Sequence, residues 1–379
     1  MELIKPGTKI NFVGFRRYAY AFSLILILIG VISLIAKGGP RYGVDFAGGT
    51  LIQVKFKAPT TPEAIREGMK ALDMTEATIQ TFGAADQNEF LIRIHQEIEK
   101  LEGLSQRVQK SLEEKFGPGK LEVRRVETVG PKVGQDLRQK ALLAIFYSLL
   151  FLAVYISGRF EQKWIMSGIV AGAIMITAYA ATLLGAGLGW LILVAGVITL
   201  IVWFVFKLKY ALGAIVALIH DVTITLGVFS LLNKEIDLTI VAALLTIIGY
   251  SMNDTIIVFD RIRETLRKTK KTSFDQVINA SINETLSRTV ITSGVTMLAV
   301  LPLYILGGPV ISDFSLAMMV GIFVGTYSSI YVASPILLIW PPETGKETAS
   351  IMVKQLFKPA VKNQGKVPAK AVARGKKKT

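Results

Sequence analysis

The chain of 379 residues contains no cysteine, and its only histidines are His95 and His220. Without cysteine it can form no disulfide, no thiolate-bound zinc site and no thiol nucleophile. Two isolated histidines are too few for a histidine-rich metal site, and the sequence has no GxxxxGK[ST] phosphate loop. We therefore expect no metal centre, no cofactor and no ATP hydrolysis, which indicates a protein that is not an enzyme.

Apolar residues, in contrast, make up 51% of the sequence, and many lie in long uninterrupted runs. This composition is typical of a polytopic α-helical membrane protein. The net charge is +15, and residues 343–379 contribute ten basic and two acidic residues to it. A basic tail beside a membrane span is expected to contact anionic lipid or an acidic partner, so we do not predict nucleic-acid binding.

Eight apolar runs are candidates for membrane spans, and the basic residues that flank them predict cytoplasmic positions for both termini. The expected parts are a cytoplasmic N-terminus (1–17), a first span (18–37), an external domain (38–138), a second span (139–158), an inserted two-span hairpin (164–206), a helical core of four spans (210–340) with a cytoplasmic loop (261–288), and a basic, disordered cytoplasmic tail (341–379).

The external segment 38–138 has the sequence pattern of a folded domain, with 15 basic and 15 acidic residues. Alternating apolar residues, as in GTLIQVKFK from Gly49, predict strands, and Thr61 followed by Pro62 predicts the start of a helix. The order β-α-β-β-α-β predicts a small α+β domain of the ferredoxin-like type. Its place between two spans predicts a periplasmic location, where His95 is expected at the surface.

The most unusual stretch is Gly249–Arg263, which ends an apolar run that begins near Leu238. It places Asn253 and Asp254 inside a membrane span, where a carboxylate costs several kcal/mol and usually has a function. Polar residues recur there at three- to four-residue spacing, so this stripe should face other helices or a hydrated cavity. Asp254 is therefore a candidate proton carrier. The alternative is a carboxylate that holds helices together through hydrogen bonds.

Three further ionisable residues accompany Asp254. Arg288 opens the next span and is its expected counter-charge, although it could also be an arginine that reaches the lipid headgroups. His220 and Asp221 lie near the middle of the span 211–232 and suit a proton relay, with polar packing as the alternative. Successive residues on a helix point about 100° apart, so we expect each to meet a different helix and not the other.

Two GxxxG pairs, Gly168 with Gly172 and Gly321 with Gly325, are expected to allow close approach of helices. This pattern is common in membrane helices and has low specificity.

Five motifs together resemble the SecF family of the bacterial Sec protein-export machinery, which is related to the resistance–nodulation–division (RND) transporters. They are GVDFAGGT, VGPKVGQDLRQKA, LIHDVTITLGVFSL, TIVAALLTIIGYSMNDTIIVFDRIRE and SRTVITSGVTML. The resemblance implies an RND-like half bundle with a periplasmic domain, and it assigns four residues to the first motif: Gly43, Asp45, Gly48 and Gly49.

The resemblance also implies a function. SecF pairs with SecD and associates with the SecYEG channel, with YajC and with YidC in the bacterial inner membrane. The complex is thought to use the proton motive force to help pull secreted polypeptides out of the channel. Asp254 and Arg288 match the family residues implicated in the proton path, to which SecD adds an aspartate. The domain 38–138 is expected to move during the cycle.

Two other functions are compatible with the pattern: half of an RND-type exporter of small molecules or lipids, or a structural translocon subunit that does not couple to protons. The chain also departs from the family, which usually has six spans. The apolar runs from about Ile165 to Phe206 are additional. They could form a lipid-facing hairpin or a docking site for another subunit.

Overall fold

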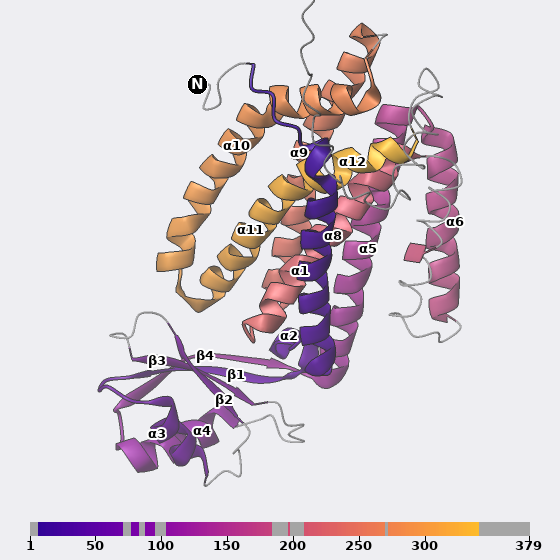
Figure 1. Cartoon of the computed structure of the whole chain (residues 1–379). Helices are drawn as coiled ribbons and strands as arrows, with labels where there is room; N and C mark the ends of the chain where they lie inside the picture. Colours follow the sequence, from indigo (N-terminus) through magenta and orange to yellow (C-terminus); the bar gives the residue numbers. More distant parts are fainter. Residues whose placement is uncertain are drawn as a thin grey trace, which may run out of the picture. The chain divides into compact units, whose positions relative to one another are not determined.

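A computed structural model of the chain describes residues 7–70, 77–82, 88–94, 104–183, 196–197, 208–269 and 272–340. It contains a small β-sheet with its own helices and a bundle of long apolar helices (Figure 1). His95 and the basic tail, residues 341–379, lie outside the described residues, so the structure does not test the expectations about them.

The sheet has four strands in the order β2-β3-β1-β4, and each neighbouring pair is antiparallel. Because β3 lies between β1 and β2, the β1–α3–β2 unit is split, as expected for a β-α-β-β-α-β chain. Thr61 caps α3 by accepting a hydrogen bond from the Ala64 N–H at 3.3 Å, and Pro62 is its first residue. The elements are β1 (Gly49–Phe56), α3 (Pro62–Met69), β2 (Thr78–Phe82), β3 (Glu89–Ile94), α4 (Leu104–Phe116) and β4 (Leu121–Val129).

Helices α3 and α4 cover the face of the sheet that points away from the helical bundle (Figure 1). Alternate strand residues such as Ile52 and Ile92 pack there against Ile65 and Leu112 and are fully buried. The opposite face is polar. It carries Glu89, whose carboxylate lies 2.7 Å from the Arg124 guanidinium. The alternation of the strands therefore separates an apolar core from a polar face that looks toward the bundle.

Within the described residues, six helical segments are long and apolar enough to cross a membrane. Five are single helices, and in the sixth α11 continues through a π-helical turn into α12 and a final 3-10 turn. They are α1 (Arg16–Ala36, preceded by a 3-10 turn at Val13–Phe15), α5 (Pro131–Glu161), α8 (Lys209–Leu231), α9 (Leu238–Lys268), α10 (Phe274–Leu306) and α11 (Gly308–Ser328) with the π turn Ser329–Ala333, α12 (Ser334–Ile336) and Leu337–Ile339.

The expected count of about eight spans is not confirmed. The first apolar run of the inserted hairpin forms α6 (Trp164–Leu183), which packs against α5 through Ala171 and Ile174. The second run lies outside the described residues apart from residues 196–197.

The segment 261–288, expected as a cytoplasmic loop, is mostly helical in the structure. Helix α9 continues to Lys268 and α10 begins at Phe274. Charged residues do not end a helix when they pair along it, and here Glu264 binds both Arg261 at 2.7 Å and Lys268 at 2.6 Å. Similarly, α5 begins at Pro131, eight residues before the expected span, because proline suits the first position of a helix.

The first part of α10 runs across one end of the bundle and the rest descends along its side (Figure 1). The segment before α1 binds to this first part. The Val13 N–H donates to the Asn279 side chain at 3.0 Å, and the Asn283 amide donates to the Ile10 carbonyl at 2.8 Å. These bonds hold the N-terminal segment against the bundle.

Glycines set two close helix crossings. A Cβ atom at Gly227 of α8 would lie 2.8 Å from the Gly30 Cα of α1, and one at Gly321 of α11 would lie 2.4 Å from the Ile247 side chain of α9. The close helix approach that was expected at Gly321 and Gly325 is therefore observed. For Gly168 and Gly172, nothing lies within 4 Å of the corresponding positions in the described part of the chain, so no close approach is seen there.

Replacement of Gly227 by alanine should lower the stability of the bundle. The new methyl group would meet backbone atoms of α1, which cannot move aside as a side-chain end can. We expect a loss of about 1–3 kcal/mol in the free energy of unfolding, seen as a lower melting temperature in detergent. Gly249→Ala in α9 is the matched control, because its Cβ would have open space, and it should leave the melting temperature unchanged or raise it. Equal melting temperatures for the two variants would contradict the prediction.

Candidate functional site: two buried carboxylates in the helical bundle

Asp221 lies midway along α8 and is completely buried. Its Oδ2 atom accepts hydrogen bonds from the Ser251 hydroxyl of α9 at 2.6 Å and from the Ser328 hydroxyl of α11 at 2.9 Å. Its Oδ1 atom lies 2.9 Å from Nδ1 of His220. This single carboxylate therefore joins three helices, and each of its oxygens has a partner.

His220 extends the network to a fourth helix. Its Nε2 atom lies 3.0 Å from the Ser23 hydroxyl of α1, and its ring stacks on Tyr327 of α11 with 6.1 Å between ring centres. A neutral imidazole that donates through one nitrogen accepts through the other, so the ring can pass a proton between Ser23 and Asp221. The expectation that His220 and Asp221 do not bond to each other is wrong. Their Cα–Cβ directions diverge, but side-chain rotation brings the ring back to the carboxylate.

Asp254 lies midway along α9 and is only 1% exposed. Its Oδ2 atom accepts one long hydrogen bond, 3.4 Å, from the Ser293 hydroxyl of α10, which also shares a 2.6 Å hydrogen bond with Thr326 of α11. Within the described part of the chain, its Oδ1 atom has no hydrogen-bond partner, and neither has the buried Thr289 hydroxyl of α10. Asp254 is thus held far more weakly than Asp221 and can change its charge without breaking a network.

Arg288 does not form the expected direct ion pair with Asp254. It lies near the middle of α10 with its side chain exposed, and the ion pairs within 4.0 Å among the described residues do not join the two. Asn253 is also exposed, although it lies in the middle of a span. A polar amide at that depth indicates that another membrane chain covers this side of α9 and α10.

The GVDFAGGT segment lies at the N-terminal end of the same helix α9. The Gly43 N–H donates to the Ile236 carbonyl at 2.9 Å, and the Asp45 carboxylate accepts from the Leu238 N–H at 3.1 Å. Asp237 accepts from the Ile240 N–H at 2.9 Å. Two carboxylates therefore cap the N-terminus of α9, where the helix dipole favours negative charge. Burial raises the pKa of Asp237 above its usual value, and the Ile240 hydrogen bond opposes that shift.

The two consecutive glycines of the motif make the turn into β1. Gly48 and Gly49 have φ angles of 76° and 119°, which favour glycine. A Cβ atom at Gly48 would also lie 2.9 Å from the Pro131 Cα, at the start of α5. The segment Gly43–Thr50 therefore ties the sheet to the first residues of both α5 and α9.

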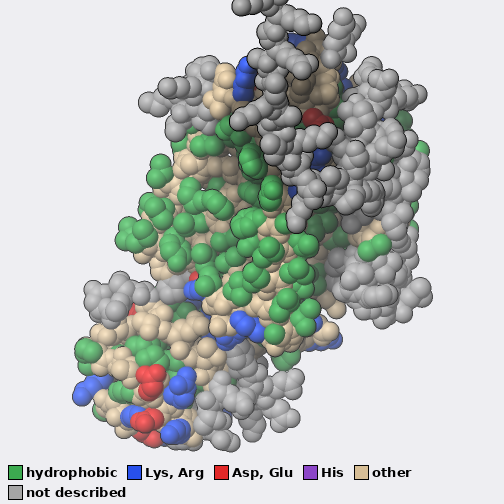
Figure 2. Space-filling view, viewed as in Figure 1, with side chains coloured by type: hydrophobic (Ala, Val, Ile, Leu, Met, Phe, Trp, Pro, Cys, Tyr) green, Lys and Arg blue, Asp and Glu red, His purple; other side chains and the backbone are tan. Residues whose placement is uncertain are grey.

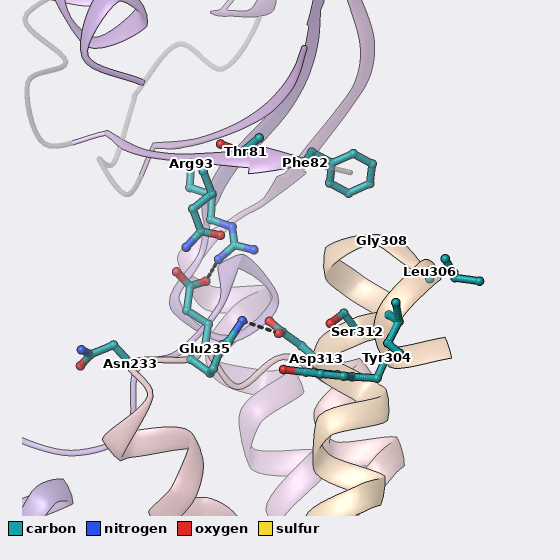
Figure 3. Close-up of a pocket in the computed structure, with 14 residues that line it drawn as sticks. Thr81, Phe82, Arg93, Asn233, Glu235, Tyr304, Leu306, Gly308, Ser312 and Asp313 are labelled. Atoms are coloured by element: carbon teal, nitrogen blue, oxygen red, sulfur yellow. Dashed lines mark hydrogen bonds and ion pairs between the residues drawn. The ribbon is translucent and has the colours of Figure 1, made fainter. Parts of the chain in front are cut away.

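A cleft of about 840 Å³ lies between the sheet and the turn that joins α10 to α11 (Figure 3). Two ion pairs line it. Arg93 of β3 binds Glu235, and Lys234 binds Asp313 of α11 at 2.7 Å. Burial lowers the pKa of Arg93, but a guanidinium stays charged in proteins. The α8–α9 connection thus contacts both the sheet and α11.

Sequence reasoning missed the hydroxyl groups that complete the site. Single serines and threonines within apolar runs are common, so their spacing alone does not distinguish a hydrogen-bond partner from a packing residue. The partners of the two carboxylates and the imidazole are Ser23, Ser251, Ser293 and Ser328. The Arg93–Glu235 pair was missed because 142 positions separate its members.

The comparison with family models finds two matches. The model described as "Protein export membrane protein SecD/SecF, C-terminal" matches residues 108–186 and 177–343. The model described as "SecD/SecF GG Motif" matches residues 33–60, which include Gly48 and Gly49.

Curated relatives match over nearly their whole length. The chain is 38% identical over 353 residues to the protein translocase subunit SecF of Magnetococcus marinus, covering 92% of this chain and 98% of that protein. It is 40% identical over 342 residues to the same subunit of Calditerrivibrio nitroreducens, covering 89% and 96%.

A solved structure is similar as well. The crystal structure of SecDF, a translocon-associated membrane protein from Thermus thermophilus, matches with a TM-score of 0.67 and 34% identity. The match covers 88% of this chain and 39% of the SecDF chain, so this chain corresponds to well under half of that protein.

Proposed function

The chain belongs to the SecF family of protein translocase subunits, and we propose that it works with a SecD chain to couple the proton motive force to polypeptide export through the SecYEG channel. It is a multi-pass inner-membrane protein and a subunit of the protein-export machinery. In the proposed orientation both termini are cytoplasmic and the sheet is periplasmic, which agrees with the basic flanks of the spans.

A SecD partner is supported by the surface of the bundle. Asn253 and Arg288 are exposed on α9 and α10, and the apolar Val295 and Leu298 are exposed on α10. A second membrane chain would cover the polar groups and could supply a further carboxylate near Asp254. The Thermus SecDF chain is more than twice as long as the part that this chain matches, as expected if SecD and SecF can occur in one polypeptide. YajC and YidC remain proposed accessory partners, and anionic lipid or an acidic protein remains the proposed contact of the basic tail.

The observation that carries the proton role is the buried Asp254 carboxylate with one unpaired oxygen. A charge in that position is costly, whereas the neutral acid is far easier to bury. Uptake and release of a proton would therefore change the free energy of this part of the bundle by several kcal/mol. A positive charge near a carboxylate favours its ionised state, so we propose that a change in the distance between Arg288 and Asp254 shifts the protonation of Asp254.

Helix α9 provides a route from the proton site to the periplasmic domain. It carries Asp254 and Ser251 at its centre, and Asp45 of the GVDFAGGT segment caps its external end. A shift or tilt of α9 would move the start of β1 with it. We propose that protonation of Asp254 changes the packing of α9 against α10, and that the motif segment passes this movement to the sheet.

His220 and Asp221 have a different part in the proposal. Their network is complete, with a hydrogen-bond partner for each carboxylate oxygen and each ring nitrogen. We propose that it holds α1, α8, α9 and α11 together and relays protons within the bundle. Relatives that are protein translocase subunits favour a role in protein export over the export of small molecules, and the sparsely bonded Asp254 supports a coupling role over a purely structural one.

The test uses Arg288→Met in the SecD-containing complex, reconstituted into vesicles with the channel. We expect export driven by a proton gradient to fall to the level without a gradient, because the Asp254 site loses its nearby positive charge. Arg288→Lys, which keeps the charge, should retain part of the stimulation. Assembly with SecD is measured in parallel. A normally assembled Arg288→Met complex that exports like the native complex under a gradient would show that Arg288 has no coupling role.

A further inference from the structure

The two edges of the sheet are chemically different. Edge strand β4 carries four charged residues (Glu122, Arg124, Arg125 and Glu127), which protect an edge against pairing with another chain. The other edge, β2, has the sequence TIQTF and carries no charge. Among the strands that the structure describes, it pairs only with β3, so about half of its backbone N–H and C=O groups have no partner strand there. The β2 edge is therefore chemically open to another extended chain.

The β2 edge also forms one wall of the 840 Å³ cleft, through Gln80, Thr81 and Phe82 (Figure 3). Gln80 and Thr81 are exposed. The opposite wall is the α10–α11 turn, where Leu306 is 82% exposed and Ile305 is 67% exposed. Tyr304 and Leu306 lie beside these helix ends in Figure 3, and Figure 2 shows hydrophobic side chains over the helical bundle. A strand edge thus faces an apolar wall across an open cleft.

The charges in the cleft balance. Arg93 is paired with Glu235, and Lys234 is paired with Asp313, so two cations meet two anions. The cleft would therefore not select a partner by its net charge. Such a lining is unsuited to a lipid, because an acyl chain would have to cover both ion pairs. It suits a chain that presents backbone groups and varied side chains.

We propose that the cleft binds an extended segment of the secreted polypeptide, which adds as a strand to the β2 edge and places apolar side chains against Ile305 and Leu306. Main-chain hydrogen bonds would supply affinity that does not depend on sequence, as in other cases of strand addition. This proposal rests on the proposed function, because that function brings unfolded chains to the periplasmic face. It assigns the polypeptide-contact surface of this subunit to residues 80–82 and 304–308.

The first experiment places a photo-crosslinking amino acid at Thr81, at Leu306 and, as a control, at Glu63, which is exposed on α3 on the covered face of the sheet. The assembled complex with SecD and the channel holds a stalled secreted polypeptide, and no proton gradient is applied. We expect cross-links to the polypeptide at Thr81 and Leu306 that exceed those at Glu63 several-fold. Equal yields at the three sites, or cross-links only to SecD or to a second copy of this chain, would overturn the proposal.

The second experiment tests strand addition itself with Gln80→Pro and Thr81→Pro, each read through the crosslinker at Leu306. The backbone N–H groups of successive residues in an edge strand point alternately toward the neighbouring strand and away from it. One of the two prolines therefore removes an N–H that points away from β3, and the other removes a hydrogen bond to β3. The variant that keeps the native melting temperature should lose the cross-link several-fold, and Gln80→Ala should keep it. A cross-link unchanged in that stable proline variant would exclude strand addition.

These readouts separate the two proposals. The cross-links of the native complex, measured without a gradient, report binding in the cleft, whereas export under a gradient reports coupling through Asp254. If the cross-links appear while Asp254→Asn exports normally, the coupling proposal fails and the cleft proposal stands. If Asp254→Asn abolishes gradient-driven export and the cross-links are absent, the cleft proposal fails and the coupling proposal stands.

Discussion

Replacement of Asp254 by asparagine should reduce gradient-driven export to the level measured without a gradient, while the protein keeps its fold. Asparagine has nearly the shape of aspartate, but its amide does not take up or release a proton at physiological pH. The carboxylate has only one long hydrogen bond to lose, 3.4 Å from Ser293, and its second oxygen has none. The structural cost should therefore be small and the functional cost large.

The measurement compares export into vesicles with and without a proton gradient, together with the melting temperature of the purified complex. Asp260→Asn is the matched control. It lies on the same helix, but its carboxylate is exposed and pairs with Arg159 at 2.6 Å. An exposed pair of this kind contributes about 1 kcal/mol or less, so the control should export normally. If Asp254→Asn exports as well as Asp260→Asn under a gradient, Asp254 is a packing residue.

The second large effect is expected at Asp221, where stability and function can be separated. Asp221→Ala removes the acceptor shared by Ser251 and Ser328 and the partner of His220. Among the described residues, the Ser251 hydroxyl and Nδ1 of His220 would then lose their partner, and Ser328 would keep only its 3.1 Å hydrogen bond to the Gly325 carbonyl. We expect the free energy of unfolding to fall by about 3–5 kcal/mol, as when one member of a buried polar pair is removed.

Asp221→Asn is the informative companion. Its amide oxygen can still accept from Ser251 and Ser328, so most of the melting temperature of the complex should remain. If Asp221 relays protons, this variant should nevertheless lose much of the gradient-driven export. An Asp221→Asn complex that is stable and exports normally would limit Asp221 to joining α8, α9 and α11. An Asp221→Ala complex as stable as the native one would contradict the network itself.

Much of the fold was accessible from local pattern. Runs of apolar residues long enough to span a lipid bilayer predict helices, because backbone groups in lipid must pair within their own segment. Alternation in GTLIQVKFK and in the other strands predicts the sheet, and Thr61–Pro62 marks the start of α3 within one residue. The errors lie at helix ends. Residues 261–268 fall in the expected loop but continue α9, because a helix does not have to end at the membrane surface.

The candidate site was only partly accessible. Asp254 stands out in the sequence because a carboxylate in an apolar run is rare, and the structure buries it. Arg288 was expected beside it, but adjacency of two helices along the chain does not specify how each is rotated. For His220 and Asp221, the helical angle between neighbours suggested separate partners. Side-chain rotation, which a helical wheel omits, brings the two within 2.9 Å.

Three properties can be inferred from the sequence alone: the protein spans a membrane, it has a small split βαβ domain, and it has ionisable groups in the middle of its spans. Those properties depend on composition and on spacing along one helix or strand. The tertiary structure decided which serines bind Asp221, which oxygen of Asp254 stays unpaired, and how Arg93 meets Glu235. Such contacts join residues far apart in the chain. Their distances depend on the rotation and crossing of whole helices, which no local pattern encodes.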